Sequence, residues 1–298
     1  MTTSGILNLN KPVGPTSAQM VTALRRLTGI DQIGHTGTLD PLAAGVLPLC
    51  VGRAVRLSEY LLHDDKVYQA EITLGVTTAT DDGEGEIIAQ QPVALTQEQI
   101  ESALATFTGA QEQVPPQYSA IKVAGRPMYE SARRGQVIEA RPRRIVIHQI
   151  RLLDWQSPRI RLEIHCGKGT YIRALARDIG ALLGCGAYLS ALTRIGCGPL
   201  TIESSVSLEM LERSADWRDH LLPMDFGLTR WPVVQLSLAD TQRILNGMSV
   251  HDDGAPQALA APHLRAYTPA GQFVAVVKHD PTHHLLRPEK VFPENIAA

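Results

Sequence analysis

The spacing of apolar and polar residues predicts a chain that mixes helices and strands. Apolar side chains occupy every second position in residues 66–74 and 159–166, which is the period of a strand with one buried face. In residues 17–29, 96–109 and 172–183 they recur at intervals of three and four, which is typical of an amphipathic helix. These elements follow no repeated strand–helix–strand order, so the pattern favours an α+β fold.

Capping and turn residues set the ends of several elements. Thr16 or Ser17 can cap the first of these helices, and Gly29 ends it. Residues 96–99 (TQEQ) form a capping box at the start of the second. The sequence also predicts a helix over residues 53–62 and a strand over residues 143–155, and turn residues predict an acidic turn over residues 81–85.

The stretch from Pro223 to Pro232 predicts a domain boundary. With 298 residues, the chain is long enough for two domains. The segment beyond the boundary has short strand patterns, including a hairpin over residues 264–279 that turns at residues 268–271. We therefore expect a larger domain over residues 1–228 and a small β-rich domain over residues 232–298.

The composition argues against several classes of protein. No apolar run approaches the ~18 residues that a membrane span needs, and the N-terminus lacks the features of a signal peptide, so we expect a cytoplasmic protein. The four cysteines form no Cys-x-x-Cys pair, which makes a disulfide framework or a metal site unexpected. No Gly-x-Gly-x-x-Gly or phosphate-loop sequence follows a strand, so we expect no nucleotide cofactor.

The charge is unevenly distributed along the chain. The net charge is −2, but residues 59–115 carry eleven acidic residues and one lysine, whereas residues 120–180 carry thirteen lysines and arginines against five acids. A basic region of this kind is typical of a surface that binds nucleic-acid phosphates. The alternative is a solvated sheet face that binds nothing, and charge alone does not decide between the two.

Residues 34–48 place a single carboxylate, Asp40, in a stretch rich in glycine and proline. Glycine permits a positive φ or a close approach to a ligand, and Pro41 removes a backbone donor directly after the acid. An Asp-Pro pair also commonly starts a helix, but Gly45 and Pro48 would end such a helix within two turns. The segment therefore predicts a tightly turned loop that presents Asp40 to an apolar surrounding.

Residues 34–41 (GHTGTLDP) and 44–48 (AGVLP) resemble the signature of the TruB-type pseudouridine synthases. This bacterial family isomerises uridine 55 in the T-loop of transfer RNA. The resemblance covers about residues 5 to 200 and includes, in the family's order, residues 6–17 (ILNLNKPVGPTS), 66–68 (KVY), 118–122 (YSAIK), 167–173 (GKGTYIR) and 184–187 (GCGA), followed by Leu192.

The resemblance implies a fold and an activity. The fold would be the pseudouridine synthase catalytic fold, with a mixed, largely antiparallel sheet and a basic, thumb-like excursion around residues 122–145. The small C-terminal domain would be an RNA-binding module of the PUA type. The protein would act on transfer RNA by extruding the uridine, cleaving its glycosidic bond and forming it again at another atom. It would act as a monomer, without a cofactor or protein partner.

This chemistry requires an ionised carboxylate beside the sugar and the base, and Asp40 is the candidate. It could attack C6 or C1′ or remove a ribose proton, and the sequence leaves these routes open. By resemblance, Arg173 is the cation that keeps Asp40 charged. Tyr68 falls on the apolar side of its strand, where a core tyrosine is the ordinary interpretation; the resemblance makes it the ring that stacks on the uracil and assists the late proton transfer from C5.

Other residues are assigned to RNA contacts by the resemblance. His35 would contact the RNA near the extruded nucleotide, and Tyr171 and Leu192 would line the uridine pocket. Thr193 and Arg194 stand where a basic pair is common in the family, which predicts one weaker phosphate contact. The basic region would supply the other backbone contacts through Lys122, Arg126, Arg133, Arg134, Arg141, Arg143 and Arg144.

Three other functions remain open. The first is a related synthase that acts on another RNA, such as a guide-dependent enzyme. The second is a tRNA-folding chaperone whose binding role is independent of catalysis. The third is a carboxylate-dependent hydrolase such as a glycosidase, which would need a second catalytic acid that the motifs do not supply.

Overall fold

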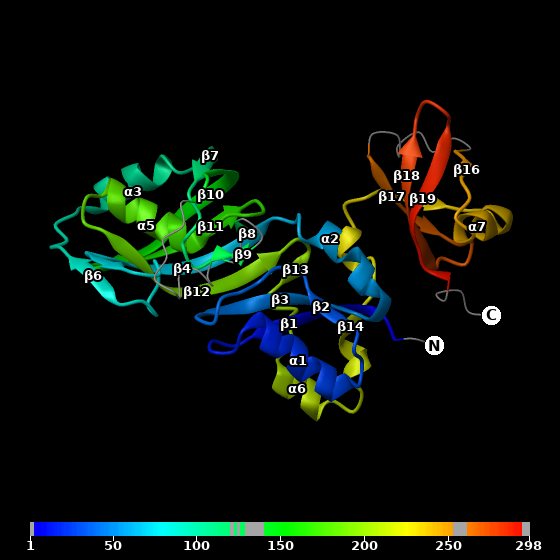
Figure 1. The fold of residues 1–298 in the computed structure, drawn as a ribbon, viewed down its shortest axis with the longest axis horizontal. Helices are drawn as coiled ribbons and strands as arrows, with labels where there is room; N and C mark the ends of the chain where they lie inside the picture. Colours follow the sequence, from blue (N-terminus) through cyan, green and yellow to red (C-terminus); the bar gives the residue numbers. More distant parts are fainter. Residues whose placement is uncertain (1–2, 120–121, 124–125, 129–139, 253–260, 294–298) are drawn as a thin grey trace.

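The computed structural model describes residues 3–119, 122–123, 126–128, 140–252 and 261–293, and it has the expected α+β architecture (Figure 1). Its main sheet runs in the order β14-β1-β3-β12-β4-β11-β10-β7, with β2 beside β3 and β13 beside β12. Neighbouring strands are antiparallel except β3 and β12, which are parallel. The strands are β1 (Gly5–Lys11), β2 (Ile33–His35), β3 (Ala43–Val51), β4 (Lys66–Leu74), β7 (Gly109–Gln113), β10 (Arg143–Gln156), β11 (Arg159–Cys166), β12 (Ala187–Cys197), β13 (Leu200–Thr201) and β14 (Leu221–Leu222).

Helices cover this sheet in two groups. α3 (Gln97–Ala105) and α5 (Ile172–Leu182) lie together beside β10 and β12, whereas α1 (Ser17–Thr28) and α6 (Leu208–Arg213) lie near β1 and β2 (Figure 1). One continuous apolar core joins both groups to the sheet. The amphipathic patterns in the sequence therefore correspond to real buried faces.

Capping fixes the helix boundaries where the sequence predicted them. Thr16 caps α1 and exchanges hydrogen bonds with Gln19 in a capping box, and Gly29 ends the helix in the left-handed conformation. Thr96 and Gln99 form the same arrangement at α3. The helix expected over residues 53–62 is instead a 3-10 helix, η1 (Gly52–Leu57), followed by the single turn of α2 (Ser58–Leu61).

We expected the segment through Pro48 to form a loop. From Ala43 onward it is instead the strand β3, so this part of the expectation was wrong. β3 tolerates a proline because its neighbours change there: pairing with β12 ends at Gly45 and pairing with β2 begins at Leu49. Gly45 is required at the β12 contact, since its φ is +99° and a Cβ there would lie 2.2 Å from the Arg194 carbonyl oxygen. The true loop is therefore short and spans residues 36–42.

The C-terminal residues form a separate five-stranded sheet at one end of the molecule (Figure 1). The predicted hairpin is confirmed as β17 (His263–Tyr267) and β18 (Phe273–Asp280). Phe273, Val276 and Phe292 pack against a buried cluster of the main domain that includes Ala54 and Leu57. The remaining elements are β15 (Val233–Gln235), α7 (Leu238–Leu245), β16 (Val250–His251) and β19 (Leu285–Val291).

The other elements are short. They are β5 (Val76–Thr78), β6 (Ile87–Gln90), β8 (Lys122–Val123), β9 (Arg126–Pro127), η2 (Trp217–His220) and η3 (Phe226–Leu228). β8 and β9 pair with each other within the region expected to form a basic excursion. Among the described residues, no helix combines the length and the apolar character needed to cross a membrane.

Candidate functional site

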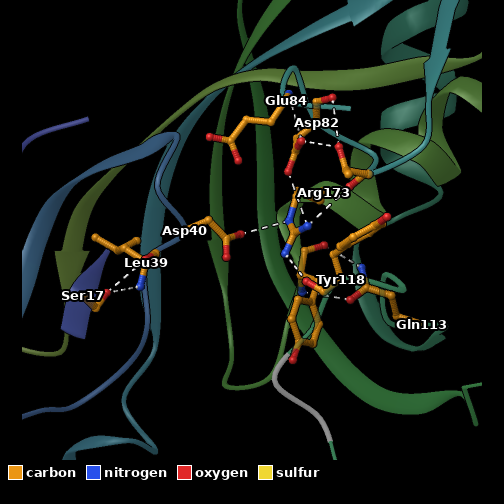
Figure 2. A network of polar contacts seen from close by, with 10 residues as sticks. Ser17, Leu39, Asp40, Asp82, Glu84, Gln113, Tyr118 and Arg173 are labelled. Carbon is orange, nitrogen blue, oxygen red and sulfur yellow. Dashed lines mark hydrogen bonds and ion pairs between the residues drawn. The ribbon is translucent and has the colours of Figure 1, made fainter. Parts of the chain in front are cut away.

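The site is built around an ion pair between Asp40 and Arg173 (Figure 2). Arg173 Nε lies 2.9 Å from Asp40 Oδ2. The arginine side chain is 6% exposed and the aspartate 37%, so the carboxylate faces an opening while its partner is enclosed. Asp40 was expected in apolar surroundings with Arg173 as its cation, and the structure pairs the carboxylate with that buried arginine.

Asp40 is held by the short loop between β2 and β3. Ser17 Oγ accepts a hydrogen bond from Leu39 N at 2.8 Å and donates one to Leu39 O at 3.0 Å (Figure 2). On the other side of Asp40, Ala43 N donates to the Asp40 carbonyl oxygen at 3.0 Å. The first residue of α1 and the first residue of β3 thus fix the backbone on both sides of the carboxylate.

Two buried cations lie beneath this loop. Lys11 Nζ donates to the carbonyl oxygens of Ala43 at 2.6 Å and Pro12 at 2.9 Å, and burial lowers the pKa of Lys11 to about 8. Arg194 is 1% exposed; its Nε donates to Val46 O at 2.6 Å and its Nη2 to Gly37 O at 3.1 Å. Both side chains therefore satisfy carbonyl groups of the segment that carries Asp40.

Arg173 is held by the first turn of α5. Tyr171 is the residue that precedes this helix, and its backbone N–H and C=O both bond to the side-chain amide of Gln113, at 2.9 and 3.1 Å. The guanidinium donates from Nη2 to Tyr118 O at 2.9 Å and from Nη1 to Thr80 O at 3.4 Å (Figure 2). Segments distant in sequence thus fix the orientation of the guanidinium.

A second carboxylate, Asp82, lies on the other side of Arg173. Arg173 Nη1 is 3.4 Å from Asp82 Oδ2, and the Asp82 side chain is 4% exposed. Asp82 also accepts a hydrogen bond from Glu84 N at 3.1 Å and one from the Thr80 hydroxyl. From the sequence, Asp82 was assigned only to an acidic turn, and no neighbouring residue in the sequence signals its contact with Arg173.

Opposing influences act on the Asp40 carboxyl group. Burial raises the pKa of Asp40, and the charge of Asp82 acts in the same direction. The guanidinium of Arg173, by charge and by hydrogen bonding, lowers it, with a smaller contribution from Lys11. Arg173 is therefore the main group that favours the ionised form.

A cavity of about 350 Å³ opens beside this ion pair. Such a volume is within the range of small-ligand sites, ~300–1,000 Å³. Its lining brings together five residues that the sequence selected: Asp40, Tyr68, Tyr171, Arg173 and Leu192. Burial raises the pKa of Tyr68 to about 12, so its hydroxyl is neutral at physiological pH, and burial also raises the pKa of Tyr171.

His35 lies apart from this group. It was expected in a loop, but it is the last residue of β2 and is half-buried. It borders a separate shallow pocket with Ala18, Arg25 and Ile33, and it is not among the residues that line the cavity at Asp40. Burial and the charge of Arg194 lower the pKa of His35.

The predicted basic contacts fall into three groups. Arg141, Arg143 and Arg144 are exposed, and the last two begin β10. Lys122 and Arg126 are described only as backbone in β8 and β9, and Arg133 and Arg134 lie outside the described residues. Arg194, expected near a phosphate contact, is instead buried beneath the Asp40 loop.

Comparison with known proteins identifies a family for this arrangement. A model of the TruB family pseudouridylate synthase N-terminal domain matches residues 25–172, and a model of the tRNA pseudouridylate synthase B C-terminal domain matches residues 173–229. tRNA pseudouridine synthase B of Stutzerimonas stutzeri is 45% identical over 92% of this chain and 90% of its own. The enzyme of the same name from Cupriavidus metallidurans is 42% identical over 96% and 93%.

Solved structures share the fold. A Cbf5 chain in a Cbf5–Nop10–Gar1 complex superposes with a TM-score of 0.74 and 24% identity, covering 96% of this chain and 84% of its own. A chain of an H/ACA ribonucleoprotein bound to a substrate RNA that contains 2′-deoxyuridine gives the same score at 23% identity, over 97% and 84%. The similarity extends through the C-terminal sheet as well as the main domain.

Proposed function

The chain belongs to the TruB family of tRNA pseudouridine synthases, and we propose that it converts uridine 55 in the T-loop of transfer RNA to pseudouridine. In this isomerisation the N1–C1′ bond breaks, a C5–C1′ bond forms, C5 loses a proton and N1 gains one. Substrate and product contain the same atoms, so the conversion consumes no co-substrate. The observation that carries the proposal is the Asp40–Arg173 ion pair at the edge of a nucleoside-sized cavity.

Asp40 acts as the ionised carboxylate of the reaction. Attack at C6, attack at C1′ and removal of a ribose proton all require the charged form, and Arg173 favours that form in a partly dehydrated site. Asp82 holds the far side of the guanidinium, so Arg173 remains aimed at Asp40. The pair thereby supplies a charged group in a fixed position before the substrate arrives.

The remaining cavity residues bind the base. Tyr68 stacks on the uracil and assists the late proton transfer from C5; as a neutral phenol, it can take that proton on its oxygen only while it passes its own hydroxyl proton on. Tyr171 and Leu192 form the walls around the nucleoside. A uridine inside a folded loop cannot reach Asp40, so it must first leave its stack. This extrusion costs on the order of a few kcal/mol, which stacking and edge contacts in the cavity offset.

The protein surface supplies the contacts to the RNA backbone. Arg141 lies just before β10, and Arg143 and Arg144 begin it; all three are exposed, and the charge of Arg143 acts on Tyr171, which lines the cavity. We assign residues 1–228 to the catalytic domain, residues around 122–145 to its basic thumb-like excursion, and residues 232–298 to a PUA-like RNA-binding domain. The protein works as a cytoplasmic monomer on transfer RNA, and His35 contacts the RNA outside the cavity.

The test is to incubate purified protein with an unmodified tRNA transcript and map pseudouridine at each uridine. We expect modification at position 55, and none in a matched transcript that carries cytidine there. Modification elsewhere would overturn the assignment of the position. A requirement for a guide RNA or added proteins would instead favour a guide-dependent synthase, the alternative suggested by the fold shared with Cbf5 in its complexes.

A further inference from the structure

A second group of reactive side chains lies outside the cavity, on β10 and β11 and just before β4 of the main sheet. Asp65, His148 and His165 bring a carboxylate oxygen and two imidazole nitrogens within 4.8 Å of one another. Asp65 Oδ2 is 3.2 Å from His148 Nε2 and 3.9 Å from His165 Nε2, and the two imidazole rings lie 4.8 Å apart. We propose that this cluster binds a divalent transition-metal ion such as Zn²⁺.

The sheet itself assembles the cluster. In the pairing of β10 with β11, Ile147 faces Cys166 and Gln149 faces His165, so His148 is the extra residue of a bulge. A bulge places two side chains against one partner position, which brings His148 beside His165 on the exposed face. Asp65 directly precedes β4, the other neighbour of β11, and its carbonyl oxygen is fixed by a hydrogen bond from Gly198 N at 3.0 Å.

The donor set fits an ion of this class. Two imidazoles and one carboxylate are ligands that zinc, cobalt and nickel prefer, whereas magnesium and calcium prefer oxygen ligands alone. A tetrahedral ion with bonds of about 2.0–2.1 Å separates its ligand atoms by about 3.3 Å. The Asp65–His148 distance already matches that spacing, and small rotations of the half-buried His165 side chain would bring in the third ligand.

The cluster is separate from the reaction centre. None of its three residues lines the cavity, although Asp65 is followed by Lys66, which does. No metal site was expected from the sequence, because its four cysteines form no Cys-x-x-Cys pair. Here the ligands are scattered through the sequence and meet only when β4, β10 and β11 pair. The proposal concerns binding of the ion alone and does not depend on the proposed function.

The test is a calorimetric titration of chelator-treated protein without an affinity tag, using Zn²⁺. We expect one ion per chain, and at least tenfold weaker binding for both His148→Gln and His165→Gln. The matched control is His283→Gln, because His283 Nδ1 lies 2.9 Å from Asp280 and, among the described residues, no third ligand group joins that pair. Binding by the control should equal that of the wild type.

The proposal is overturned if the wild type binds Zn²⁺ no more tightly than a Kd of about 100 µM, or if both glutamine variants bind as the wild type does. It is also overturned if those variants lose tRNA affinity while the wild type takes up no ion, which would make the cluster an RNA contact. The visible absorption of Co²⁺ added to the wild type reports whether nitrogen and oxygen atoms ligate the ion. Because this measurement uses no variant, it tests the proposal even if a variant fails to fold.

Discussion

Asp40 and Arg173 meet at the edge of the cavity from two different elements, one on the loop before β3 and the other in the first turn of α5. Each is fixed by its own backbone contacts, through Ser17 on one side and through Tyr118 and Gln113 on the other. The ion pair therefore depends on contacts from several elements of the domain rather than on one motif. Substitutions of either residue can be chosen to change its charge or its position separately.

Replacing Asp40 with asparagine removes the charge and keeps the shape. We expect Asp40→Asn to lower the single-turnover rate of pseudouridine formation by about 10²–10⁴-fold or more, with tRNA binding changed little because the RNA contacts remain. The measurement is a rapid-quench assay together with a filter-binding titration. Substantial residual pseudouridine from the variant would refute the role of Asp40.

The same substitution should change stability in a pH-dependent way. The folded state raises the pKa of Asp40, so the folded protein binds this proton more readily than the unfolded chain does. Protonation of Asp40 therefore stabilises the folded protein at a pH below the ordinary carboxyl pKa. This stabilisation is lost as the pH rises through the raised pKa of Asp40. At neutral pH, Asp40→Asn should therefore melt at a higher temperature than the wild type, and the difference should shrink in acid. A lower Tm for the variant at pH 7 would contradict this expectation.

Replacing Arg173 with lysine keeps the charge but removes the planar fork that contacts both carboxylates. We expect Arg173→Lys to lower the rate at saturating tRNA by at least about tenfold. The weaker pairing should also raise the pKa of Asp40 further, so the acidic limb of the pH–rate profile should move to higher pH. Arg177→Lys is the control, because Arg177 lies one turn later on α5 and pairs with Asp81 instead. Equal effects of the two substitutions would count against a special role for Arg173.

The ring and the hydroxyl of Tyr68 can be separated by two substitutions. Tyr68→Phe keeps the stacking surface, so tRNA affinity should persist while the rate falls through loss of the hydroxyl. Tyr68→Leu should lower both the tRNA affinity and the rate, because it also removes the aromatic ring, and stacking of a base on such a ring contributes about 1–3 kcal/mol. Single-turnover rates and binding constants measured side by side test this, with Tyr188→Phe on β12 as a control outside the cavity. If Tyr68→Phe has the wild-type rate, the hydroxyl takes no part.

Local sequence signals predicted the elements whose stabilising contacts are local. The capping box at Thr16 fixes α1, and the alternation of residues 66–74 matches β4 over its full length. The pattern failed at residues 43–48, because glycine and proline are typical of loops. Gly45 and Pro48 are compatible with β3 only because of how β12 and β2 pair there.

The site was predictable as far as a family motif reached. The resemblance selected Asp40, Tyr68, Tyr171, Arg173 and Leu192, and the structure places all five at one cavity, although their roles remain predictions. Asp82 was missed because nothing near it in sequence shows that it faces Arg173. Arg194 was expected near a phosphate contact by resemblance, and its partners at Gly37 and Val46 become visible only in the fold.

Arg194 is therefore expected to act as a positioning residue for the loop that carries Asp40. Arg194→Met would leave the carbonyl groups of Gly37 and Val46 without their donor, which should lower the free energy of unfolding by about 1–3 kcal/mol. The rate should also fall, because Gly37 belongs to the loop that sets the position of Asp40. Urea denaturation and single-turnover kinetics give the two readouts.

A matched variant separates positioning by Arg194 from a general loss of stability. Val277 is fully buried in the C-terminal sheet, so Val277→Ala should cost a similar free energy of unfolding, about 1–3 kcal/mol, far from the cavity. Well below the melting temperature it should leave the rate constant for bound tRNA unchanged, whereas Arg194→Met should lower it. Arg194→Lys should fall between, since one ammonium group cannot reproduce the spacing of two guanidinium nitrogens. If Arg194→Met loses stability but keeps the wild-type rate, Arg194 supports the fold and does not position Asp40.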